Sequence, residues 1–207
     1  MKTGMCIAAL AACLTASLSA CGGGGGSAGT GTTPLTPPVS SNGNLDAYVG
    51  TWASACAAHA VDTAVIARAA GSNNALTIAV TTTYYANTAC TGDVIATQVW
   101  SAPTTATYVG TVASTIMPGS VSASIDKVTA QQPQRSVTLT GTFVSRKFVD
   151  GQPNWCIDYA GGSVCVPDRI YAAEPTPFDG LAIVGGKLVE VKSNAVNYDA
   201  VERFTKR

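Results

Sequence analysis

The stretch SVTLTGTF, residues 136–143, decides the fold class. Threonines alternate in it with larger apolar side chains, which is the two-residue period of a strand that buries one face. We expect this strand to run from Ser136 to about Val149. The dipeptide Asp150-Gly151 follows, a two-residue hairpin signal, and it predicts an antiparallel partner strand over Asn154–Asp158.

The same pattern of short strands and turns recurs on both sides of this stretch. Gly185-Gly186 is a second hairpin signal, and no amphipathic helix is evident. The further strand-like runs are 48–57, 63–69, 76–81, 94–100, 107–114, 121–128, 181–184, 187–192 and 198–206. Eight to ten strands at such spacing predict one all-β antiparallel domain over residues 46–207, either a barrel or a sandwich.

The N-terminus has the pattern of a secretory signal. Lys2 precedes an apolar run from Met5 to Leu18, which is too short to span a bilayer comfortably. The run ends in Leu-Ser-Ala-Cys21, which resembles the bacterial lipobox. The resemblance implies a signal peptide over residues 1–20 and lipidation of Cys21, whose acyl chains would anchor the protein. The alternative is an ordinary cleaved signal, with Cys21 an incidental thiol.

Residues 21–45 are rich in Gly, Pro and Ser, the composition of a flexible tether. Gly22 follows Cys21, where an Asp would resemble the signal for retention in the inner membrane. For a Gram-negative host we therefore expect a lipid anchor in the outer membrane. The domain would then lie in the periplasm or at the cell surface.

A short motif at the start of the domain resembles the lipocalins. Gly50-Thr51-Trp52 is the Gly-x-Trp that opens the first strand of that family. The resemblance implies a barrel with Trp52 at its closed end, under an arginine from near the last strand, here Arg203. The alternative is that Trp52 is a plain core residue. Taken together, the anchor, the glycine run and this motif resemble uncharacterised Gram-negative lipoproteins, a likeness that implies no activity.

Four cysteines remain after the signal and the lipidated residue, namely Cys56, Cys90, Cys156 and Cys165. An even number in an oxidising compartment predicts two disulfides. Three pairings are open, of which the most local joins Cys56 to Cys90 and Cys156 to Cys165. A zinc site is the alternative, but the spacings lack any Cys-x-x-Cys pair, so we expect no metal.

Charge and histidine content limit the possible chemistry. The chain has 12 basic and 12 acidic residues, so no basic surface for nucleic acid is expected. His59 is the only histidine, and no Gly-x-Ser-x-Gly motif accompanies it. A carboxylate pair, for example Asp158 with Asp168, would suit a glycosidase, but nothing in the spacing requires one. We therefore expect neither an enzyme nor a cofactor.

The aromatic residues indicate one kind of binding site. The candidates to line a barrel mouth are Tyr84, Tyr85, Trp100, Tyr108 and Trp155. Such a mouth would hold an apolar or carbohydrate ligand, whereas the alternative for these side chains is core packing. We expect a non-catalytic binding domain on a membrane-anchored lipoprotein. The alternative is a structural or protein-binding envelope lipoprotein without a pocket, and a buried carboxylate pair would instead indicate catalysis.

Overall fold

Strands make up almost all of the chain that the structure describes. The computed structural model describes residues 45–159 and 162–207, so the signal, Cys21 and the tether before Leu45 lie outside the described residues. The described part has one short 3-10 helix, η1 (Leu45–Tyr48), and fourteen strands. The strands are β1 (Gly50–Ser54), β2 (Ala60–Arg68), β3 (Ala75–Tyr85), β4 (Val94–Trp100), β5 (Thr104–Met117), β6 (Val121–Gln132), β7 (Val137–Thr140), β8 (Val144–Val149), β9 (Gln152–Tyr159), β10 (Gly162–Pro167), β11 (Glu174–Pro175), β12 (Gly180–Val184), β13 (Lys187–Ser193) and β14 (Tyr198–Lys206).

The all-β antiparallel prediction is confirmed, and β4 and β14 have the predicted bounds. The predicted count of eight to ten strands is too low. One reason is that residues 136–149 form two strands, β7 and β8, instead of one. Gly141, between them, has a φ of 148°, and a side chain there would collide with the carbonyl group of Ile95. The chain therefore leaves the large sheet at Gly141 and enters a second, smaller one.

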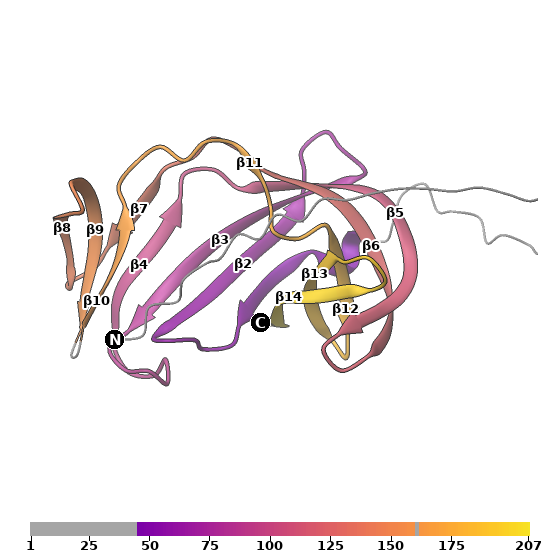
Figure 1. Ribbon diagram of the computed structural model, residues 1–207, viewed down its shortest axis with the longest axis horizontal. Helices are drawn as coiled ribbons and strands as arrows, with labels where there is room; N and C mark the ends of the chain where they lie inside the picture. Colours follow the sequence, from indigo (N-terminus) through magenta and orange to yellow (C-terminus); the bar gives the residue numbers. More distant parts are fainter. Residues whose placement is uncertain (1–44, 160–161) are drawn as a thin grey trace, which may run out of the picture. The chain divides into compact units, whose positions relative to one another are not determined.

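Eight strands of the large sheet close into a ring, in the order β6, β12, β13, β14, β1, β2, β3 and β5, with β5 pairing back to β6 (Figure 1). The ring is not a regular barrel. The long strand β5 pairs with β3 and β6 and also makes a short parallel contact with β14. Strands β4 and β7 continue the sheet beyond β3, outside the ring.

The interior of the ring is a packed core around Trp52, which is 2% exposed and whose indole N–H donates to the carbonyl oxygen of Tyr48 at 2.7 Å. Leu188 of β13 and Phe204 of β14 belong to this core. Val189 alternates with Leu188 and therefore belongs to a second cluster, on the other face of β13. The far half of the β5–β6 hairpin covers that outer face and contributes to the second cluster.

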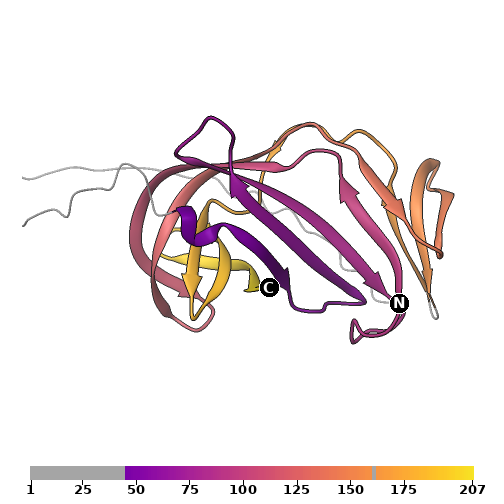
Figure 2. The ribbon, with the colours of Figure 1, turned by 180° about the vertical axis from the view of Figure 1, so that it is seen from behind.

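The small sheet has the strand order β10-β9-β8 and lies beside β4 and β7 (Figures 1 and 2). Its central strand contributes Ile157, which is fully buried in a third cluster with Ile95 of β4 and Leu139 of β7. The hairpin predicted at Asp150-Gly151 joins β8 to β9, and the one at Gly185-Gly186 joins β12 to β13. Both turn predictions are confirmed.

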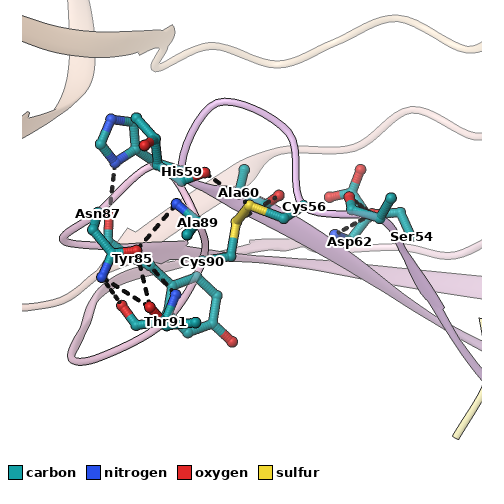
Figure 3. The surroundings of a disulfide bond; sticks show 12 residues. Ser54, Cys56, His59, Ala60, Asp62, Tyr85, Asn87, Ala89, Cys90 and Thr91 are labelled. Carbon is teal, nitrogen blue, oxygen red and sulfur yellow. Dashed lines mark hydrogen bonds between the residues drawn. A yellow bond between two sulfur atoms is a disulfide. The ribbon is translucent and has the colours of Figure 1, made fainter.

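Two disulfides close the structure, and they have the most local of the three possible pairings. Cys56, after β1, is bonded to Cys90 in the loop that follows β3 (Figure 3). Cys156 is bonded to Cys165 at directly paired positions of β9 and β10. Disulfides persist in oxidising compartments, which indicates an extracytoplasmic domain. Within the described residues, no helix has the length and apolar character needed to cross a membrane.

Candidate functional site

A cavity of about 180 Å³ lies on the inner side of the curved sheet. Its floor is formed by buried side chains, and its rim by partly exposed charged and aromatic ones. The lining residues of the floor are Ile78, Thr104, Phe178 and Phe204, and those of the rim include Asp62, Trp100, Gln132, Arg135, Glu190 and Glu202. The lining therefore combines charged and polar side chains with aromatic ones.

Strand alternation places three carboxylates on this inner side. Glu190 shares a face of β13 with the core residue Leu188, and Glu202 shares a face of β14 with Phe204. Glu190 and Glu202 are direct Cα partners in the β13–β14 pair. Side chains at such positions have Cβ atoms about 5 Å apart. Asp62 of β2 lines the same cavity.

The proximity of these acids changes their protonation. Burial, followed by the charges of Glu202 and Asp62, raises the pKa of Glu190 from 4.5 to about 8. Burial and then the charge of Asp62 also raise the pKa of Glu202. At neutral pH Glu190 therefore carries a proton. Like charges at close range cannot all ionise without cost, and the cavity shows this effect on two of its three acids.

Asp62 is the one acid of the three with hydrogen-bond partners among the described residues. The hydroxyl of Thr82 donates to Asp62 Oδ1 at 2.5 Å, and the backbone N–H of Asp62 donates to Ser54 Oγ at 2.9 Å. Figure 3 shows Asp62 beside Ser54, not far from the first disulfide. Within residues 45–159 and 162–207, neither Glu190 nor Glu202 has a hydrogen bond or an ion pair through its side chain.

One guanidinium group lies at the rim. Arg135 follows β6, and its guanidinium carbon lies 4.0 Å from the ring centroid of Trp100, a cation–π contact. Its Nη2 donates to the side-chain oxygen of Gln132. Burial lowers the pKa of Arg135, while Glu174 and Tyr171 oppose that effect. Tyr171 also meets Trp100 edge-on, with ring centroids 5.1 Å apart, so Trp100 is held by two neighbours.

Three of the five aromatic residues predicted to line a barrel mouth, namely Tyr84, Trp100 and Trp155, pack against the third cluster, and the other two lie elsewhere. Of them, Trp100 alone lines the cavity among the described residues. Tyr108 is buried in the core of the ring, and Tyr84 and Trp155 pack in the cluster beneath the small sheet. Tyr85 lies beside His59 (Figure 3). The five therefore share no single cavity lining, and whether any of them binds a ligand stays a prediction.

The lipocalin-like motif is only partly reproduced. Trp52 is buried at the core, and Gly50 has a φ of 138°, a conformation that favours glycine. The cation over the Trp52 ring is Lys206, with its Nζ 5.3 Å from the centroid, and the two residues are paired across β1 and β14. Arg203 is exposed and alternates with Phe204, so it points to the other face of β14.

The remaining candidates for catalysis are engaged in structural contacts. His59 Nδ1 lies 3.2 Å from the carbonyl oxygen of Tyr85. Asp158 pairs with Lys147 of β8 at 2.5 Å, and Asp168 pairs with Arg146 of β8 at 2.9 Å. The two aspartates therefore do not form a carboxylate pair with each other. The pair that does exist, Glu190 with Glu202, was not predicted from the sequence. It is the kind of pair named above as an indication of catalysis, so a test of this cavity has to follow conversion of the ligand as well as binding.

One signal in the sequence could have identified that pair. In the run Leu-Val-Glu-Val, residues 188–191, an acid stands between two valines on the face of a buried leucine. A charged residue on the inward face of a strand is unusual unless it is paired or functional. Glu202, before Phe204, has the same pattern on the last strand.

Among the described residues, no group of three or more His, Cys, Asp or Glu side chains is placed to hold a metal ion. The chain matches no known protein-family model, no curated protein and no solved structure. Its function therefore has to be argued from the cavity itself.

Proposed function

We propose that this protein is a ligand-binding lipoprotein of the cell envelope, whose β domain holds a small polar molecule in the cavity of its ring. One observation carries the proposal: a cavity of about 180 Å³ is lined by two acids, Glu190 and Glu202, whose side chains have no partner among the described residues. Sites for drug-sized molecules occupy about 300–1,000 Å³. The smaller volume favours a ligand of the size of an amino acid, a diamine or a monosaccharide.

The partial burial of two unpaired acids supports a binding role. Keeping carboxyl groups away from water costs free energy, and a domain selected for stability alone would gain by replacing them. The apolar part of the ring interior is already filled by its own side chains. A large apolar ligand, as in lipocalins, would therefore have to displace the core, whereas a small polar ligand needs no such rearrangement. A ligand inside a ring of antiparallel strands is also what the resemblance to lipocalins implies.

The binding test blocks the cavity from its floor. Thr104→Phe would fill the space, and Thr105→Phe is the matched control, because Thr105 is the exposed neighbour on β5. Ligand-detected NMR with a panel of amines, amino acids and sugars should show binding that Thr104→Phe abolishes and Thr105→Phe retains. Binding that survives in both variants would place the ligand elsewhere. Chemical conversion of a bound ligand would overturn the non-catalytic assignment.

Membrane attachment rests on the lipobox-like residues and is tested separately. Cys21→Ser removes the thiol that would receive lipid, so the protein should move from the membrane to the soluble fraction of the cell. A variant that still sediments with membranes would contradict the anchor. Separated inner and outer membranes would then show which of them holds the native protein.

A second candidate function, protein binding, is supported by the small sheet. The edge strand β8 has no strand on its outer side among the described residues, and its Phe148 is 81% exposed. Phe143, just before β8, is 52% exposed. Open edges and exposed apolar side chains are typical of surfaces that add a strand from a partner. Crosslinking in intact cells should then depend on Phe148 and not on the cavity residues.

A further inference from the structure

The charge of the cavity narrows the class of ligand, on the basis of the binding function proposed above. Three carboxylates line it against one guanidinium group. That group, on Arg135, stacks on Trp100 and bonds to Gln132, and it has no ion pair with Glu190 or Glu202. The guanidinium group of Arg135 is therefore held at the rim by Trp100 and Gln132 and does not neutralise the two glutamates. With all acids ionised, the lining carries a net charge of −2, three negative against one positive.

A largely buried threonine on the cavity floor gives an independent indication of a ligand. Thr104 is 7% exposed, and its Cα partner across β3 and β5 is Ile78, which also lines the floor. The side chain of Thr104 therefore faces the cavity. Within the described residues its hydroxyl has no hydrogen-bond partner, and it is not among the buried unpaired polar atoms, so it is open to the cavity. The cavity thus offers an unused hydroxyl below unused carboxylates.

We infer that the cavity binds a small organic cation, with its ammonium group held by Glu190 and Glu202. The aromatic rings of Phe178 and Phe204 line the same space. Aromatic faces attract ammonium groups, and the effect grows when the cation is removed from water. The hydroxyl of Thr104 accepts a hydrogen bond from an N–H of the ligand or donates one to a polar group at its far end.

A neutral sugar fits the site less well than an organic cation. Carbohydrates are bound by stacking on an open aromatic face, and Trp100 already carries Arg135 over its ring. A sugar would also leave Glu190 and Glu202 without a counter-charge. A small anion would meet three acids. An ammonium compound alone among these classes satisfies the acids, the rings and the hydroxyl together.

Cation binding has a consequence that can be measured besides affinity. The groups that face Glu190 are Glu202 from β14, Asp62 from β2 and Arg135 at the rim. Glu190 is protonated in the empty cavity at neutral pH, and a bound ammonium group favours its ionised form. Binding at pH 7 should therefore release a proton to the buffer. Calorimetric titrations in two buffers of different ionisation enthalpy detect that proton.

The experiment titrates the full chain with 1,4-diaminobutane and with choline, and uses glucose and glutarate as the neutral and anionic comparisons. We expect binding of at least one of the two cations, with proton release, and none of the comparisons. Glu190→Gln combined with Glu202→Gln should weaken cation binding at least tenfold. Asp199→Asn, which removes an exposed carboxylate from β14, should leave it unchanged.

Each result has a defined meaning. Glucose binding without cation binding overturns this inference and leaves the proposed binding function intact. Glutarate binding does the same and assigns the site to Arg135. Cation binding that persists in the double Gln variant also overturns it, because the acids then do not hold the ligand. If none of the four compounds binds, and the wider panel shows no binding sensitive to Thr104→Phe, both proposals fail.

Discussion

Replacing Glu190 by Gln should stabilise the domain at alkaline pH and leave it nearly unchanged at acid pH. Burial, Glu202 and Asp62 raise the pKa of this carboxyl from 4.5 to about 8. Because the folded state holds its proton more tightly than the unfolded state, the unfolded state is favoured as pH rises. Ionising the buried Glu190 therefore costs folding free energy. This cost is absent below pH 4.5, grows as the pH rises, and reaches its full size above about pH 8.

The size of this effect follows from the two pKa values. The interval from 4.5 to 8, at about 1.4 kcal/mol per pH unit, corresponds to a penalty of about 5 kcal/mol above pH 8. Glu190 keeps some contact with solvent, which screens part of that penalty. We therefore expect Glu190→Gln to gain about 2–5 kcal/mol at pH 9 and less than about 0.5 kcal/mol at pH 4.5.

Thermal unfolding measured across pH tests the reasoning. A domain of this size shifts its Tm by about 2–4 °C per kcal/mol, so the variant should gain at least about 4 °C at pH 9. At pH 4.5 the Tm should stay within about 2 °C of the parent. Asp199→Asn is the control and should show no gain that depends on pH. An equal gain at both pH values, or none at pH 9, would refute a buried carboxyl as the cause.

Three further experiments test the contacts that hold the fold together. Gly141→Ala should lower the free energy of unfolding, measured in urea, by about 2–4 kcal/mol, because the added Cβ would collide with the backbone of β4. The control Gly151→Ala lies in an open turn and should cost about 1 kcal/mol. Equal losses in the two variants would contradict the steric explanation. Cys56→Ser with Cys90→Ser opens a 34-residue span and should cost about 3–4 kcal/mol, and an unchanged urea midpoint would show that this bridge is dispensable. Tyr48→Phe removes a hydroxyl that donates to the carboxylate of Asp126 on β6 at 2.8 Å, so the free energy of unfolding should fall by about 1–2 kcal/mol. An unchanged free energy of unfolding would show that this hydrogen bond does not stabilise the fold.

The strands could be predicted because each one is a local pattern. Alternation over residues 136–140 and 198–206 depends only on which side chains face water, and Gly185-Gly186 needs no partner elsewhere in the chain to form a turn. The closure of the ring could not be predicted in this way. It depends on β5, which pairs with β6 from Thr105 to Ile116, pairs with β3 at its first residues and meets β14 at its last ones. The pairings of β5 with β3 and β14 join segments far apart in sequence.

The break at Gly141 shows the same limit. The run of alternating residues continues through it, so the sequence predicts one strand where the structure has β7 and β8. What ends β7 is the approach of β4, whose Ile95 carbonyl takes the place where a side chain would be. A glycine inside a strand pattern often marks such a close approach of another backbone. The neighbour itself is visible only in the folded chain.

The candidate site could not be predicted from local sequence patterns, because its acids come together only through the register in which the strands pair. Glu190 and Glu202 become neighbours through the pairing of β13 with β14, and a shift of one residue would move either of them to the outer face. Like charges at directly opposite positions destabilise a sheet, and a Lys or Thr at either position would relieve the repulsion. The pair has no compensating cation among the described residues, while Arg135 is held at the rim by Trp100. A cation supplied by a ligand would offset this cost, and without one the proton on Glu190 relieves the repulsion.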